Sequence, residues 1–197
     1  MNLESYQVRL LKGSEVEEYI QRLAELRVEV FRAYPYLYHG TMDYEVHYLS
    51  RLAQSPRSRV VIALHRNETV GASTALPLSE ADRDFQKPYP NPEAYFYFGE
   101  SVLRESHRGR GLGHAFFDGR EQAARALGFS KTCFCAVVRP SDHPLKPLDY
   151  RPLDDFWKKR GYRPVEGRTC SYSWTDVNES EETSKVMQFW ERDLDAL

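Results

Sequence analysis

The chain has 197 residues, of which 41% are hydrophobic and 28% are charged, and its 27 lysines and arginines nearly balance 29 aspartates and glutamates. This length predicts one globular domain over residues 1–197, because domains usually have about 100 to 200 residues. A formal net charge of -2 excludes a protein whose whole surface is built to bind nucleic acid or anionic lipid, since such surfaces are strongly basic.

The sequence shows no targeting or membrane segment. Its start, MNLESYQVRL, lacks a basic stretch followed by an apolar one, and the longest apolar run, Cys133 to Val138, is far too short to span a bilayer. We therefore expect a cytoplasmic protein. The three cysteines form no CxxC pair, which favours buried reduced thiols over metal or redox chemistry. In a C-x-C strand, Cys133 and Cys135 point to one face of the sheet.

The first elements are read from periodicity and capping patterns. Residues 6–11 alternate like a strand, and Ser14 with Glu17 has the spacing of a capping box that opens a helix. An apolar stripe continues that helix to about Phe31. After a tyrosine-rich connector, Thr41 is the expected cap of a second helix.

That second helix should end near Gln54, and residues 60–65 and 69–78 then predict a β-hairpin. Gly99, inside the next strand, marks a bulge or a close backbone approach. The rest of the chain is predicted to contain, in order, a strand at 95–103, a helix at 112–127 capped by Gly128, a strand at 132–138, a short helix at 152–160 stopped by Gly161, and closing strands at 170–174 and 186–190.

A glycine-rich segment stands between the 95–103 strand and the helix after it. Three glycines in five positions leave a turn without side chains, so backbone N–H groups can converge on an anion. The helix that begins there adds free N–H groups and the positive end of its dipole. Together with the neighbouring arginines, this segment suits a pyrophosphate; it consists of Arg108, Gly109, Arg110, Gly111, Leu112 and Gly113.

Two well-known phosphate loops do not match this segment. A Rossmann fingerprint needs a glycine where His114 or Phe116 stands, and a Walker loop needs Gly-Lys, whereas this chain has Lys12-Gly13 in the opposite order. The pattern R-x-x-G-x-G does match. A second signature follows at 156–162, with the sequence FWKKRGY.

In both signatures and in the order of its elements, the chain resembles the GNAT superfamily of N-acetyltransferases. The resemblance implies an α/β (α+β) fold with a mixed, mostly antiparallel sheet of about seven strands, a splayed pair formed by the fourth and fifth strands, and about four flanking helices. It implies acetyl-CoA as cosubstrate and no metal. The diphosphate of CoA would lie on the glycine loop and His114, with the pantetheine arm along the backbone of Ser101, Val102 and Leu103.

Amide donors on that strand would also polarise the thioester carbonyl. An amine attacks only when unprotonated, so a base near neutral pH helps the reaction. Glu100 is the candidate, because it shares a face with Val102 and because many relatives have a glutamate there. The alternative interpretation is a strand-end carboxylate paired with an arginine such as Arg104.

At the position of the acid that protonates the leaving thiolate, the sequence differs from the family pattern. The family often uses a tyrosine four residues before the Gly-Phe glycine, and this chain has Trp157 at that position. Tyr150, in the proline-rich loop, is the first replacement and His143 the second. The thiolate can also leave unassisted, since it is far less basic than an alkoxide.

The acceptor is expected to enter between the tyrosine-rich connector and the 139–152 loop. Aromatic rings and carboxylates there would suit a small amine, although the tyrosines can equally cover the edge of the core. The leading prediction is an acetyl-CoA-dependent N-acetyltransferase acting on a small-molecule amine in a ternary complex, with a possible homodimer. The alternatives are a CoA-binding regulatory module and a nucleotide binder. The residues of the predicted acceptor side are Tyr34, Tyr36, Tyr38, His39, Asp142, His143, Asp149 and Tyr150.

Overall fold

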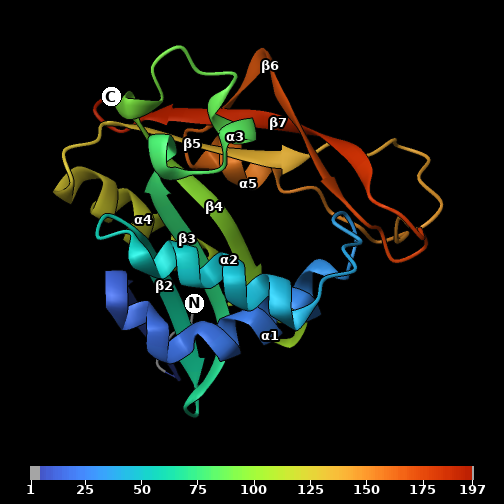
Figure 1. Cartoon of the computed structure of the whole chain (residues 1–197), viewed down its shortest axis with the longest axis horizontal. Coiled ribbons are helices and arrows are strands. Elements are labelled where there is room, and N and C mark those ends of the chain that lie inside the picture. Colours follow the sequence, from blue (N-terminus) through green and yellow to red (C-terminus); the bar gives the residue numbers. More distant parts are fainter. Residues whose placement is uncertain (1–4, 197) are drawn as a thin grey trace.

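The computed structural model describes residues 5–196 and shows one mixed sheet with helices on both faces (Figure 1). Residues 1–4 and 197, which belong to the range of the predicted domain, lie outside the described part. The strands are β1 (Tyr6–Lys12), β2 (Arg59–His65), β3 (Glu68–Pro77), β4 (Tyr95–Leu103), β5 (Lys131–Val137), β6 (Arg163–Trp174) and β7 (Thr183–Asp193). The α-helices are α1 (Ile20–Phe31), α2 (Met42–Gln54), α3 (Arg83–Gln86), α4 (Leu112–Ala126) and α5 (Asp154–Lys159).

The seven strands have the order β1-β2-β3-β4-β5-β7-β6. All neighbours are antiparallel except β4 and β5, which run parallel. This sheet and its flanking helices confirm the predicted fold class. The aromatic C-terminal strand β7 lies between β5 and β6, so it is an interior strand that is paired on both sides. The edge strands are β1 and β6. No helix within residues 5–196 is both long and apolar enough to cross a membrane.

The helices bury the sheet from two sides. Leu23 of α1 and Leu49 of α2 lie in the core on one face, and Phe117 of α4 packs with Tyr162 on the other face. Full burial of such a side chain stabilises the fold by about 1.5–3 kcal/mol. The three cysteines are free and buried. Cys133 and Cys135 belong to the same core cluster as α1 and α2, on one face of the sheet, as the C-x-C pattern predicts.

Most predicted boundaries agree with the structure to within a few residues. Thr41 caps α2 by accepting a hydrogen bond from the Tyr44 N–H at 3.4 Å. The β2–β3 hairpin turns through Arg66 and Asn67, whose φ angles of 50° and 67° are those of the two-residue turns that match strand twist.

Three local predictions were wrong. The first helix opens with a 3-10 segment at Gly13–Tyr19, and its cap is the bond from the Lys12 N–H to Glu15, so the Ser14 capping box does not form. The four-residue helix α3 was missed because it is too short to show a periodicity. β6 starts at Arg163, well before the predicted 170, because an irregularity between Pro164 and Thr169 hides the alternation.

The predicted bulge in β4 is present and controls which way its side chains point. Ser73 pairs with Ser101 but Ala75 pairs with Phe98, so Gly99 and Glu100 together face the single residue Thr74. The extra residue reverses the alternation. Phe96 and Phe98 lie on the α4 face, and beyond the bulge Glu100 and Val102 share the face of α1 and α2, as the sequence predicts.

Gly99 is required for this close approach, and we expect Gly99→Ala to destabilise the protein by about 1–3 kcal/mol. An added Cβ would lie 2.6 Å from the Thr74 Oγ1, and that oxygen also accepts the Glu100 N–H at 3.3 Å. Urea unfolding measures the change. In a Thr74→Ala background the same substitution should destabilise the protein less, and equal effects in both backgrounds would contradict the proposed clash.

Candidate active site

The glycine loop stands where the sequence places it, between β4 and the first turn of α4. Gly109 and Gly111 have φ angles of 73° and 90°, in the left-handed region that favours glycine. Gly111 is the N-cap of the 15-residue helix α4, and no side chain caps that helix. The first N–H groups of α4 are therefore left for water or a ligand. Leu112 is fully buried and anchors the loop to the core.

The arginines of the loop keep their guanidinium groups at the surface. Arg108 donates from Nε to the Leu103 carbonyl oxygen at 3.3 Å, and Arg110 donates from Nη2 to the Ser106 carbonyl oxygen at 3.4 Å. His114, also exposed, packs its ring on Phe156 at 4.9 Å between ring centres. The two guanidinium groups lie beside the free end of α4, so an anion there meets both amides and cations.

A gap opens between β4 and β5 beyond their first few residues. The two strands pair only where Tyr95–Tyr97 face Lys131–Cys133, and then they diverge (Figure 1). The Arg104 N–H donates to the Val70 carbonyl oxygen at 3.0 Å. Since N–H groups alternate between the two edges of an antiparallel strand, this bond directs the N–H groups of Ser101 and Leu103 into the gap and that of Val102 toward β3.

Glu100 is the centre of a buried charge cluster on the α1–α2 face. Its carboxylate lies 2.5 Å from the Arg27 Nη1, and only 8% of its side chain is exposed. It also accepts a hydrogen bond from the Tyr48 hydroxyl at 3.1 Å. The alternative interpretation, a carboxylate paired with an arginine, is met by Arg27 and not by the suggested Arg104, which pairs with Glu29 at 2.9 Å.

Arg27 is shared between two carboxylates. Its Nε donates to Glu45, whose side chain is completely buried. Burial alone would lower the pKa of Arg27, but the neighbouring Glu100, Tyr48 and Glu45 raise it above its usual value. The guanidinium is therefore always charged, and with both carboxylates ionised the cluster carries one net negative charge. Neither Arg27 nor Glu45 was predicted as a site residue, although an arginine in the apolar stripe of α1 was the available signal.

The proline-rich loop after β5 packs against the connector between α1 and α2. The Tyr150 ring meets the Tyr34 ring edge to face at 4.6 Å, and His143 lies 5.7 Å from Tyr34 between ring centres. The pKa of Tyr150 is raised by burial and then by Tyr34 and Asp154. The structure thus brings Tyr34, His143 and Tyr150 together, as predicted for the acceptor side.

Tyr36 reaches further into the molecule than its neighbours. Its pKa is raised, first by burial and then by Cys135, Glu100 and Tyr150. The Tyr36 ring lies 4.7 Å from that of Phe31 and 6.1 Å from that of Trp174, between ring centres. The sequence places Tyr36 among the acceptor contacts, and in the structure its ring packs on these two aromatic residues.

The other predicted acceptor residues do not join this group. Tyr38 turns toward Glu45, which together with burial raises the pKa of its phenol. His39, Asp142 and Asp149 are exposed. In the described part of the chain, no three His, Cys, Asp or Glu side chains gather as ligands of a metal ion.

One arginine ties the connector to the far end of the sheet. Arg139, which follows β5, donates to the Tyr36 carbonyl oxygen at 2.7 Å and forms an ion pair with Asp176 at 2.6 Å. The His39 N–H donates to the Thr175 carbonyl oxygen at 2.8 Å. These bonds fix the connector between α1 and α2 to the segment that follows β6.

Trp157, at the position where the family often has a tyrosine, is a packing residue. Its ring lies 5.0 Å from those of Phe134 and Trp190, edge to face in both cases. Gly161 after α5 has a φ angle of 87°, and Tyr162 is fully buried. The FWKKRGY signature therefore forms a helix stop and an aromatic core.

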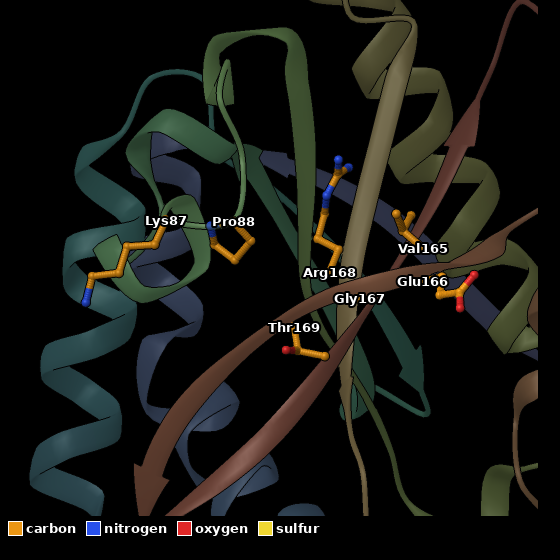
Figure 2. A pocket seen from close by; sticks show the side chains of 7 residues that line it. All are labelled: Lys87, Pro88, Val165, Glu166, Gly167, Arg168 and Thr169. Carbon is orange, nitrogen blue, oxygen red and sulfur yellow. The ribbon is translucent and has the colours of Figure 1, made fainter.

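A hollow of about 510 Å³ elsewhere on the surface is unrelated to these groups. Figure 2 shows it between Lys87–Pro88 and the irregular part of β6, residues 165–169. None of its lining residues belongs to the glycine loop, the β4–β5 gap or the Glu100 cluster. The predicted site is thus a loop and a strand gap at the protein surface, separate from this hollow.

Sequence comparison decides the family. A model of the acetyltransferase (GNAT) family matches residues 21–148, from α1 through the glycine loop to the proline-rich loop, which is more than half of the chain. The chain belongs to the GNAT family. As a GNAT acetyltransferase it combines the parts described above: the glycine loop, the splayed strands and the buried carboxylate. No curated protein sequence matches the chain.

Solved GNAT structures share the fold at low sequence identity. An N-acetyltransferase from Staphylococcus aureus Mu50 is 13% identical, with a TM-score of 0.64, and the alignment covers 96% of this chain and 98% of that one. A putative acetyltransferase from Acinetobacter baylyi has 10% identity, a TM-score of 0.65 and coverages of 97% and 94%. A putative acetyltransferase from Salmonella typhimurium, solved with acetyl-CoA, has 10% identity, a TM-score of 0.61 and coverages of 98% and 96%.

Proposed function

We propose that the protein transfers the acetyl group of acetyl-CoA to the primary amine of a small molecule, by direct attack in a ternary complex. The observation that carries the proposal is the buried Glu100 cluster next to the gap between β4 and β5. Glu100 follows the bulge at Gly99 and shares with Val102 the face of α1 and α2, the side on which the aromatic acceptor residues gather.

The residues present fit the diphosphate of acetyl-CoA. The free N–H groups of α4, the left-handed glycines and the exposed Arg108 and Arg110 form an anion site of the expected kind. A Cβ added to Gly109 would meet no atom within 4 Å, so the loop is open on its outer side. When bound, acetyl-CoA supplies the activated acyl group, and the pantetheine arm would follow the amides of Ser101 and Leu103.

Glu100 is suited to take the proton from the amine. Its carboxylate is buried beside the β4–β5 gap and shares Arg27 with Glu45, and a positioned carboxylate can act as a general base. The Tyr48 hydroxyl holds one carboxylate oxygen at 3.1 Å, which orients Glu100 for this step.

The Ser101 N–H would donate to the thioester oxygen as negative charge develops there. The experiment that tests the proposal measures release of free thiol from acetyl-CoA with a panel of small amines. We expect turnover that depends on the amine, with an acetylated amine as product. Tight acetyl-CoA binding without transfer to any amine would favour the alternative, a CoA-binding module that has lost its chemistry.

Tyr150 is our candidate for the acid that protonates the leaving thiolate. We expect Tyr150→Phe to lower kcat by about 10-fold, which is a modest effect because a thiolate also leaves unassisted. Binding of acetyl-CoA should change little. Tyr36→Phe is the matched variant in the connector between α1 and α2, at a tyrosine whose ring packs on Phe31 and Trp174, and a larger loss of kcat in that variant would transfer the role to Tyr36.

A further inference from the structure

Arg120 is a buried arginine of α4 that lies directly under the β4 bulge. Only 2% of it is exposed. Its Nη1 donates to the carbonyl oxygens of Glu100 at 3.1 Å and Thr74 at 3.4 Å, and its Nη2 donates to the Ser101 Oγ at 2.8 Å. The guanidinium therefore holds the residues on both sides of the bulge.

The charge of Arg120 has no carboxylate partner among residues 5–196; each donor bond goes to a carbonyl or hydroxyl oxygen. The guanidinium lies instead on the rings of Phe98 and Phe117, at 4.4 and 4.8 Å from their centres. Burial lowers the pKa of Arg120 to about 10, so the side chain is still charged at neutral pH. An unpaired buried charge is unfavourable for stability, and packing alone does not require one at this position.

The acceptor that matters most is the Glu100 carbonyl oxygen, because it belongs to the same peptide unit as the Ser101 N–H. One end of that peptide faces Arg120 at 3.1 Å, and the alternation fixed by Arg104 and Val70 directs the other end into the β4–β5 gap. A charged donor on the carbonyl polarises the peptide and strengthens its N–H as a hydrogen-bond donor.

We propose that Arg120 is a positioning residue, which shapes the bulge and, through the Glu100–Ser101 peptide, strengthens the Ser101 N–H that faces the acyl thioester. This inference rests on the proposed function. The effect is larger in the transition state than in the bound ground state, because negative charge grows on the thioester oxygen as the amine attacks. Arg120 itself touches neither substrate.

The test uses two variants and one matched control. Arg120→Lys keeps a charge but loses the planar fork of donors, and Arg120→Met removes the charge with a side chain of similar length. The control is Arg125→Met, since Arg125 is on the same helix and also donates to a backbone carbonyl, that of Leu194 at 3.0 Å, away from the site. Variants that unfold below the assay temperature in a thermal melt are set aside, and the lysine variant then carries the test.

Two readouts distinguish polarisation from a merely structural role. We expect kcat to fall about 10-fold in Arg120→Lys and further in Arg120→Met, with the Kd of acetyl-CoA within about 3-fold of the wild type, because one weakened donor of an oxyanion site affects mainly the transition state. The infrared band of the thioester carbonyl of bound, 13C-labelled acetyl-CoA should lie below that of free acetyl-CoA in the wild type and move back toward it in the variants. Arg125→Met should change neither.

The outcomes separate this inference from the proposed function. If the wild type transfers acetyl groups and shifts the carbonyl band, but folded Arg120→Lys shows the wild-type band and kcat, the role of Arg120 is overturned. If the wild type neither transfers acetyl groups to any amine nor shifts the band, the proposed function itself fails.

Discussion

Gly109→Val is expected to weaken acetyl-CoA binding by about 5- to 150-fold. The residue has a φ angle of 73°, and forcing a branched side chain into that region costs about 1–3 kcal/mol, where each 1.4 kcal/mol is tenfold in affinity. Without ligand, the loop of the variant can relax to a conformation that valine prefers. Binding of the diphosphate forces the loop back into the strained conformation, and the cost of this strain lowers the affinity. Calorimetric titration with acetyl-CoA measures the loss.

Gly128→Val provides the matched control for this substitution. Gly128 follows the other end of α4 with a φ angle of 84°, and an added Cβ at either glycine meets no atom within 4 Å. Gly128→Val should lose thermal stability and keep its affinity, whereas Gly109→Val should lose affinity with a smaller loss of thermal stability. Equal affinity losses in the two variants would show that the effect is general strain in α4, with no specific role for the loop.

Glu100→Gln should lower the turnover number by about 100-fold or more, the usual contribution of a positioned base, while the Kd of acetyl-CoA stays within about 3-fold. The glutamine has the same shape but accepts no proton near neutral pH. Stability should change little, because Arg27 keeps Glu45 as its partner and the cluster becomes neutral. Initial rates of thiol release, followed across pH, measure the effect.

Glu29→Gln is the control for that variant. Glu29 also forms an ion pair with an arginine, Arg104 at 2.9 Å, but its side chain is 51% exposed and lies outside the cluster. It should keep wild-type turnover. Wild-type turnover in Glu100→Gln would remove Glu100 from the mechanism, and equal losses in both variants would point to a general electrostatic effect.

The predictions that succeeded depended on local signals. The glycine loop and the bulge at Gly99 follow from residues that allow a particular backbone conformation, and the hairpin turn at Arg66 and Asn67 follows from the two apolar strands on either side of it. The order of the strands along the chain followed from the alternation of apolar residues and from the turn residues between them. Glu100 could be singled out because a carboxylate inside a strand needs a partner or a function.

The partners of Glu100 were beyond local signals. Arg27, Glu45 and Arg120 come from three different helices. Only the packing of those helices on β4 brings Arg27, with its partner Glu45, to the Glu100 carboxylate, and Arg120 to the Glu100 carbonyl oxygen. Each of the three interrupts the apolar face of an amphipathic helix. An ionisable residue at a core-facing helix position is therefore the signal by which such partners could be found in the sequence, although that signal does not say which carboxylate or carbonyl they meet.

A crystal structure of the complex with acetyl-CoA tests the central claim most directly. The account predicts that the backbone N–H groups of residues 109–113 lie about 2.7–3.2 Å from diphosphate oxygens, with the thioester carbonyl near the Ser101 N–H. A structure in which acetyl-CoA binds elsewhere, with these amides turned toward solvent, would contradict it.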